Sequence, residues 1–151
     1  MTTSKNNISN RLKKIRNWMK KQNIDCYFIP HSDEYLSEYI PPENERLSWI
    51  TGFSGSAGLA IITHKKGAIF VDGRYTVQVK EQVNSSLYEI LHIKENPWDI
   101  WTKKNLQSDS KIGYDPRLHQ ANWEENTKKL LIGNITLFPI NDNPIDLFWD
   151  D

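Results

Sequence analysis

The stretch 51-TGFSGSAGLAIITHKKGAIFVDGRY-75 joins three regularly spaced glycines to two apolar runs and a polar turn. Gly52, Gly55 and Gly58 stand three residues apart, directly ahead of residues that favour a strand. A P-loop would need Lys and Ser or Thr after its last glycine, and a dinucleotide fingerprint would place its glycines between a strand and a helix. The stretch meets neither requirement, so we interpret the glycines as a turn or a close backbone approach.

The two apolar runs that follow, LAIIT and AIFVD, flank a turn that contains Gly67 and predict the strands of an antiparallel hairpin. Asp72 comes at the end of the hairpin, where it can cap a helix expected over residues 75–83. Arg74 lies in the first turn of that helix, where a cation opposes the helix dipole. A guanidinium donates paired hydrogen bonds to carboxylate or carbonyl oxygens, so peptide recognition is a chemically reasonable role for Arg74.

Outside this stretch, helical and strand patterns alternate along the chain. An opening amphipathic helix is predicted from the spacing of Ile8, Leu12, Ile15 and Met19, with Asn23 at its end. Further strands are expected at 26–30, 88–93, 111–115 and 135–140, and further helices around 43–49, after Pro97 and over 121–131, the last ended by Gly133. This alternation favours an α/β domain whose mixed sheet is covered on both faces.

The composition excludes several classes of protein. Nineteen Lys and Arg balance nineteen Asp and Glu, so no overall field attracts nucleic acid or an anionic membrane. No signal peptide and no 18-residue apolar run is present, and the lone Cys26 reads as a small buried hydrophobe, so a soluble cytosolic protein is expected. The six tryptophans are interpreted mainly as core residues, with partner-facing tryptophans as an open alternative.

Metal and acid–base chemistry find little support in the sequence. The four histidines lie far apart and form none of the spacings that metal sites use. The acidic residues grouped in the polar segment after the first strand are interpreted as a solvated face; they are Asp33, Glu34, Glu38, Glu43 and Glu45. We therefore expect neither a metal site nor catalytic residues in this chain.

Four segments together resemble the N-terminal domain of Xaa-Pro aminopeptidases, of the creatinase/prolidase N-terminal type. They are IPHSDEYLSEYIPPENERLSWITGFSGSAGLAIIT, FVDGRYTVQ, IGYDPRL and NPIDLFW, and SEYIPP, TGFSGSAG and DGRY are the most specific parts. The resemblance covers nearly the whole chain and implies one domain over residues 1–151. Its implied fold is α/β with ribonuclease H-like topology, a mixed sheet of about six strands flanked by helices.

The resemblance also implies a function. The family releases the residue that precedes a proline at the N-terminus of a peptide, with two metal ions, usually manganese, held in a C-terminal pita-bread domain. This chain contains no such domain, so it is expected to be inactive alone, to bind no cofactor and to act in a cytosolic homodimer. Arg74 maps onto the family's substrate-binding arginine. The remaining motif residues are expected to be structural; they are Gly52, Gly55, Gly58, Asp72, Gly73 and Tyr75.

Two alternatives remain open from the sequence. The chain could be a stand-alone binding or oligomerisation module, or the N-terminal domain of a related Xaa-Pro dipeptidase or creatinase. Phe148 and Trp149 lie near the end of the chain. They are expected to lack packing partners and to promote weak self-association.

Overall fold

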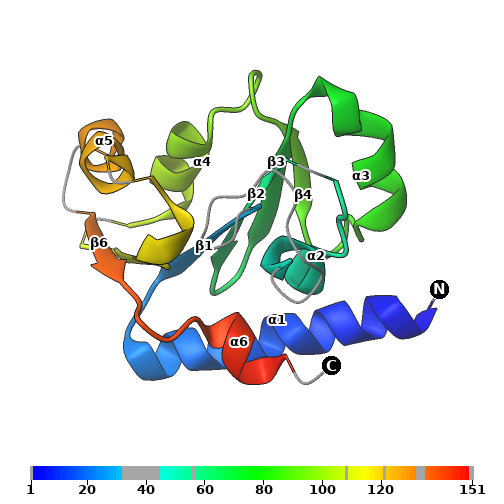
Figure 1. Ribbon diagram of the computed structural model, residues 1–151, viewed down its shortest axis with the longest axis horizontal. Coiled ribbons are helices and arrows are strands. Elements are labelled where there is room, and N and C mark those ends of the chain that lie inside the picture. The colour runs from blue at the N-terminus through cyan, green and yellow to red at the C-terminus, as the bar shows by residue number, and fades with distance from the viewer. Residues whose placement is uncertain are drawn as a thin grey trace.

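The computed structural model describes residues 2–31, 45–55, 57–107, 109–120, 122–131 and 135–149 (Figure 1). Six strands form one sheet in the order β4-β3-β2-β1-β5-β6. Their bounds are β1 Cys26–Pro30, β2 Leu59–Thr63, β3 Gly67–Val71, β4 Glu89–His92, β5 Lys111–Tyr114 and β6 Thr136–Pro139. The predicted mixed sheet of about six strands is confirmed, while the SEYIPP segment and the helix end at Gly133 lie outside the described residues.

Strand direction decides which loops meet at one edge of the sheet. Strand β2 runs antiparallel to both β1 and β3, which confirms the predicted hairpin, and all other neighbouring strands are parallel. The carboxyl ends of β1, β3, β4, β5 and β6 therefore share one edge. In α/β sheets this edge is where ligands usually bind.

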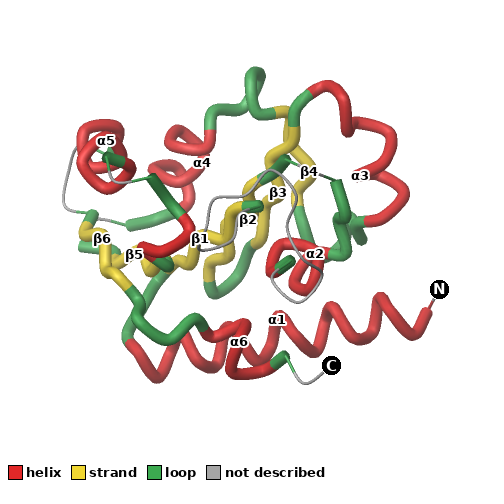
Figure 2. The backbone as a smooth tube through the Cα atoms, viewed as in Figure 1, coloured by secondary structure: helices red, strands yellow, loops and turns green. Residues whose placement is uncertain are grey.

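Helices cover both faces of the sheet (Figures 1 and 2). One core cluster joins the sheet to α1 (Thr2–Gln22), α2 (Arg46–Thr51), α3 (Thr76–Gln82) and α6 (Pro144–Phe148). The other joins its opposite face to α4 (Trp98–Asn105) and to the region of α5 (Trp123–Leu130). The three-layer arrangement agrees with the alternation of strands and helices in the sequence.

The N-terminal helix confirms the sequence pattern most directly. Ile8, Leu12, Ile15 and Met19 are buried against the sheet, and they share the face that their spacing predicts. Asn23 has a φ of 57°, in the left-handed region, and it follows the last residue of α1. Short polar residues tolerate this conformation, so Asn23 ends the helix as expected.

Several expectations need correction. The helix expected from residue 75 begins as a 3₁₀ turn, η2 (Gly73–Tyr75), because Asp72 caps the backbone N–H of Arg74 instead of one further along. The main interpretation of the tryptophans is confirmed, because all six are buried or half-buried and pack against one of the two core clusters. The periodicity of residues 121–131 places Leu130 on the same side as Trp123 and Leu131, but Leu130 is 46% exposed while Leu131 is buried in the core.

The C-terminal segment differs most from expectation. It forms a helix, α6, that the strand and helix patterns did not indicate, with the side chain of Asn143 accepting a hydrogen bond from the N–H of Ile145. Phe148 packs against the core beside α1, and the indole of Trp149 stacks on Trp49 with ring centroids 6.2 Å apart. The prediction that Phe148 and Trp149 lack partners is wrong, because this helix folds back onto the domain (Figure 1).

Candidate functional site

The candidate site begins where β3 ends at the carboxyl edge of the sheet. Val71 is the last residue of β3, and Asp72 turns the chain into η2. One carboxylate oxygen of Asp72 accepts the backbone N–H of Arg74 at 2.9 Å, which confirms the predicted cap although the capped element is a 3₁₀ turn. The two residues are thereby fixed on one short turn.

The same carboxylate also holds the guanidinium of Arg74. Nε of Arg74 lies 3.2 Å from Oδ1 of Asp72, and Nη2 lies 2.9 Å from Oδ2. The hydrogen bond with Arg74 lowers the pKa of Asp72 and raises the pKa of Arg74, so both groups stay charged. The side chain of Arg74 is still 69% exposed, and its Nη1 group has no hydrogen-bond partner among the described residues. The pair thus presents an anchored guanidinium with one unused edge.

Tyr75 links this turn to the glycine-rich stretch. The guanidinium carbon of Arg74 lies 5.2 Å from the centre of the Tyr75 ring, within cation–π range. The Tyr75 ring also makes an edge-to-face contact with the buried Phe53, with ring centroids 5.5 Å apart. A Cβ on Gly55 would overlap the Phe53 ring, so only glycine fits there without movement.

The backbone and packing also explain why glycine occupies the other two positions, 52 and 58. Gly52 ends α2 with a φ of 86°, and its N–H donates to the carbonyl of Ser48 at 2.8 Å. A Cβ on Gly58 would lie 3.1 Å from a methyl carbon of Leu47, which is tight. These contacts agree with the interpretation that the glycines lead the chain into the sheet beneath DGRY.

Helix α3 fastens the glycine-rich stretch from outside. The side-chain oxygen of Gln82 accepts the N–H of Ser54 at 2.9 Å, and its amide nitrogen donates to the Ser54 hydroxyl at 2.8 Å. Because α3 follows η2 directly, these bonds join the segments on either side of the hairpin. They hold the glycine-rich stretch against the helix that follows the Arg74 turn.

A shallow hollow of about 540 Å³ opens beside this turn. Asp72, Gly73 and Arg74 line one side, and His92 and Lys94 line the other. Sequence reasoning missed His92 and Lys94 because they come from β4 and its following loop, and the parallel register that pairs His92 with Val71 is not visible in the sequence.

A second Asp-x-Arg turn lies at the end of β5. The N–H of Arg117 donates to Asp115 at 3.0 Å, and its Nη2 lies 2.9 Å from the same carboxylate. Here the carboxylate is buried and also accepts from Asn143 at 3.0 Å. Burial favours a raised pKa for Asp115, but the hydrogen bonds from Arg117 and Asn143 outweigh it and the pKa lies below its usual range. This pair ties β5 to α6 and is structural.

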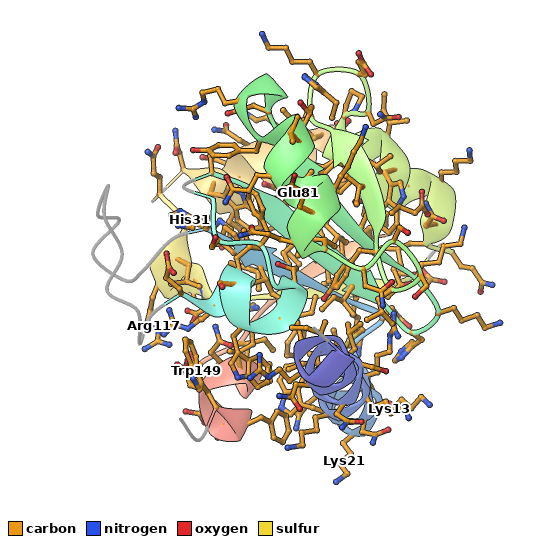
Figure 3. The ribbon with its side chains drawn as sticks, turned by 90° about the vertical axis from the view of Figure 1, so that its right-hand side faces the viewer. Lys13, Lys21, His31, Glu81, Arg117 and Trp149 are labelled. Carbon is orange, nitrogen blue, oxygen red and sulfur yellow. The ribbon has the colours of Figure 1, made fainter. Side chains whose placement is uncertain are left out.

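A cluster of charged side chains extends from this turn to α2. The guanidinium of Arg46, only 4% exposed, makes two hydrogen bonds to Asp146 at 2.9 and 3.0 Å. Arg117 approaches the same carboxylate at 3.7 Å. Figure 3 shows Arg117 and Trp149 on the same side of the molecule, and α6 itself packs beside α1 and α2.

The remaining histidines form no site with these residues. His31 follows β1 and lies 3.5 Å from a carboxylate oxygen of Glu45. His119 stacks on Trp123 with centroids 3.8 Å apart, and burial lowers its pKa to about 4. Among the residues that the structure describes, no group of three or more His, Cys, Asp or Glu side chains could hold a metal ion.

Comparison with known proteins identifies the family to which the chain belongs. The Creatinase/Prolidase N-terminal domain family matches residues 11–145. The chain belongs to this family. It is 34% identical over 144 residues to Xaa-Pro aminopeptidase 2 of Rattus norvegicus and 37% identical over 146 residues to a probable Xaa-Pro aminopeptidase P of Aspergillus fumigatus. Each alignment covers 95% of this chain, but the chain spans only about a fifth of the relatives' length, 21% and 22%.

Solved structures agree with this assignment. The X-prolyl aminopeptidase of Caenorhabditis elegans, described as a cytosolic enzyme with a di-nuclear active site, superposes with a TM-score of 0.85 at 26% identity. The match covers 94% of this chain and 25% of that one. A creatinase/prolidase-like N-terminal domain from Corynebacterium diphtheriae shares the fold, with a TM-score of 0.65 at 18% identity, and the match covers 88% of this chain and 95% of that one. No helix within the described ranges is long and apolar enough to cross a bilayer.

Proposed function

We propose that this creatinase-type domain is the N-terminal domain of a Xaa-Pro aminopeptidase and that Arg74 binds its peptide substrate. The observation that carries the proposal is the anchored guanidinium at the carboxyl edge of the sheet. Asp72 holds two of its nitrogens, and Nη1 is left to donate outward. The identity of 34–37% to Xaa-Pro aminopeptidases over nearly the whole chain supports the choice of parent enzyme.

In this proposal Arg74 binds and orients the substrate. A guanidinium fixed at one edge by a carboxylate loses little freedom when its other edge donates to a peptide carbonyl or carboxylate oxygen. The glycines, Asp72 and Tyr75 hold it in place. Attack on the scissile bond by a metal-activated water would belong to a separate catalytic domain.

The finer features are proposals of the same kind. We propose two manganese ions in that catalytic domain, a cytosolic location and a homodimer. The description of the nematode relative as a cytosolic enzyme with a di-nuclear active site supports the first two in part.

The test of Arg74 uses the longer enzyme that contains this domain. Replacing Arg74 by alanine is expected to lower kcat/KM for a Xaa-Pro tripeptide roughly 10- to 100-fold, the range for losing a charge-assisted hydrogen bond. The kcat/KM of Arg74→Lys should lie between those of the unchanged enzyme and Arg74→Ala, because an ammonium keeps the charge and loses the forked contact with Asp72. Lys80→Ala, on the exposed side of α3, is the matched control. An unchanged kcat/KM in Arg74→Ala would refute the role.

A further inference from the structure

His92 lies directly against the Asp72–Arg74 turn. It is the last residue of β4 and pairs in parallel register with Val71, the residue before Asp72. Nε2 of its imidazole is the nearest atom to a Cβ built on Gly73, at 3.4 Å. The imidazole is therefore a wall of the hollow that also contains Arg74.

The hydrogen bonds of His92 determine which ring nitrogen can donate. Nδ1 of His92 accepts the backbone N–H of Lys94 at 3.2 Å, so the neutral ring carries its proton on Nε2. The carbonyl of His92 accepts the N–H of Asn96 at 2.9 Å, which fixes the backbone of this loop. Nε2–H is thus a donor that faces the side of Gly73, and Lys94, exposed, lines the same hollow.

Donors outnumber acceptors in this hollow. Among the described residues that line it, the single carboxylate, Asp72, is already bonded to Arg74, whereas Nη1 of Arg74, Nε2 of His92 and the ammonium of Lys94 have no described hydrogen-bond acceptor. With one carboxylate against one guanidinium and one ammonium, the hollow carries a net charge of about +1 before His92 is counted. A ligand with a negative oxygen complements it.

We propose that His92, Lys94 and the outer edge of Arg74 form a subsite for the free C-terminal carboxylate of a short peptide substrate. The inference rests on the proposed function, because Arg74 must face bound peptide. A phosphate held through the backbone N–H groups of this turn is a poorer match. The N–H groups of Arg74 and Tyr75 already donate to Asp72.

The subsite predicts a preference for peptide length and end group. A tripeptide extends only about 10 Å from end to end, so its carboxylate stays close to the scissile bond. Longer peptides and peptide amides would pass the hollow without placing a carboxylate in it. A short Xaa-Pro-Xaa acid should therefore bind better than its amide.

The direct test is a titration of this 151-residue chain with Ala-Pro-Ala and with Ala-Pro-Ala amide, followed by NMR of the histidine imidazoles. The acid is expected to shift the imidazole resonances of His92 and to bind about tenfold more tightly than the amide. A loss of affinity of about tenfold is what removal of one charge-assisted hydrogen bond is expected to cause. His64, in the hairpin turn at the opposite edge of the sheet, is the internal control and should not move. If the His92 resonances do not move, or move equally with the acid and the amide, the proposed subsite is refuted.

Variants in the longer enzyme separate this subsite from the proposed function. In His92→Ala the ratio of kcat/KM for the acid to that for the amide should fall about tenfold, and His92→Gln, which keeps a donor, should restore part of it. Lys80→Ala should leave the ratio unchanged. If Arg74→Ala lowers kcat/KM but His92→Ala keeps the preference for the acid, the subsite fails while the proposed function stands. If Arg74→Ala has no effect on either peptide, the proposed function itself fails.

Discussion

Replacing Gly55 by alanine is expected to destabilise the domain through a single overlap. A Cβ at this position would occupy space held by the outer ring atoms Cζ and Cε of Phe53. Phe53 is fully buried and its ring meets Tyr75 edge-on, so it cannot turn away without opening the core. Adding a methyl group to a packed core usually costs about 1–3 kcal/mol.

The middle of this range, about 2 kcal/mol, should lower the melting temperature by roughly 4–8 °C for a chain of this length. The matched control is Gly73→Ala, because a Cβ there would make only an ordinary contact, 3.4 Å from Nε2 of His92. That variant should change the free energy of unfolding by no more than about 0.5 kcal/mol. Urea denaturation followed by tryptophan fluorescence would measure both variants.

A double variant tests whether the overlap with the Phe53 ring causes the loss of stability. Leucine at position 53 lacks the ring atoms that the new Cβ would meet, so Phe53→Leu should relieve the overlap although it weakens packing by itself. The free energy lost in Gly55→Ala/Phe53→Leu should be smaller than the sum of the single losses by about 1 kcal/mol. Equal stability of Gly55→Ala and Gly73→Ala, or strict additivity in the double variant, would refute the reasoning.

Two further predictions concern buried charge. Asp146→Ala should lower the free energy of unfolding by about 2–3 kcal/mol, because it leaves the buried guanidinium of Arg46 without its carboxylate. Asp142→Ala, at an exposed position, is the control and should have little effect. Equal urea midpoints for the two variants would contradict this prediction. Burial lowers the pKa of His119 to about 4, so between pH 6.5 and 4 the unfolded chain binds a proton that the folded chain does not. Stability should therefore fall by about 3 kcal/mol as the pH drops through this window. His119→Phe, which keeps a ring on Trp123, should remove that part of the fall, and an unchanged pH dependence would contradict the assignment.

The local elements were predictable where side-chain periodicity and local chemistry agree. The spacing of Ile8, Leu12, Ile15 and Met19 matches one face of a helix, and the structure buries that face. The hairpin was predictable because two short β-branched runs flank a turn with glycine. Asp72 was recognised as a cap because its type and place fit a helix start.

Features that depend on the pairing of distant segments were not predictable. The sequence did not reveal that the register of β3 and β4 brings His92 beside the turn of Asp72 and Arg74. The short helix α6 was missed, although Asn143 followed by proline is a usable start signal. Its packing involves the half-buried ion pair of Arg46 and Asp146, which lie 100 residues apart in the chain, so no local pattern reports it.

The measurement that tests the central claim most directly is hydrolysis of a Xaa-Pro tripeptide in the presence of manganese. It compares this 151-residue chain with the same chain extended by whatever its gene encodes next. The account predicts release of the first residue by the extended protein and none by the chain alone. Activity in neither protein would contradict the assignment as the N-terminal domain of a Xaa-Pro aminopeptidase, and activity in the short chain would contradict the claim that catalysis belongs to another domain.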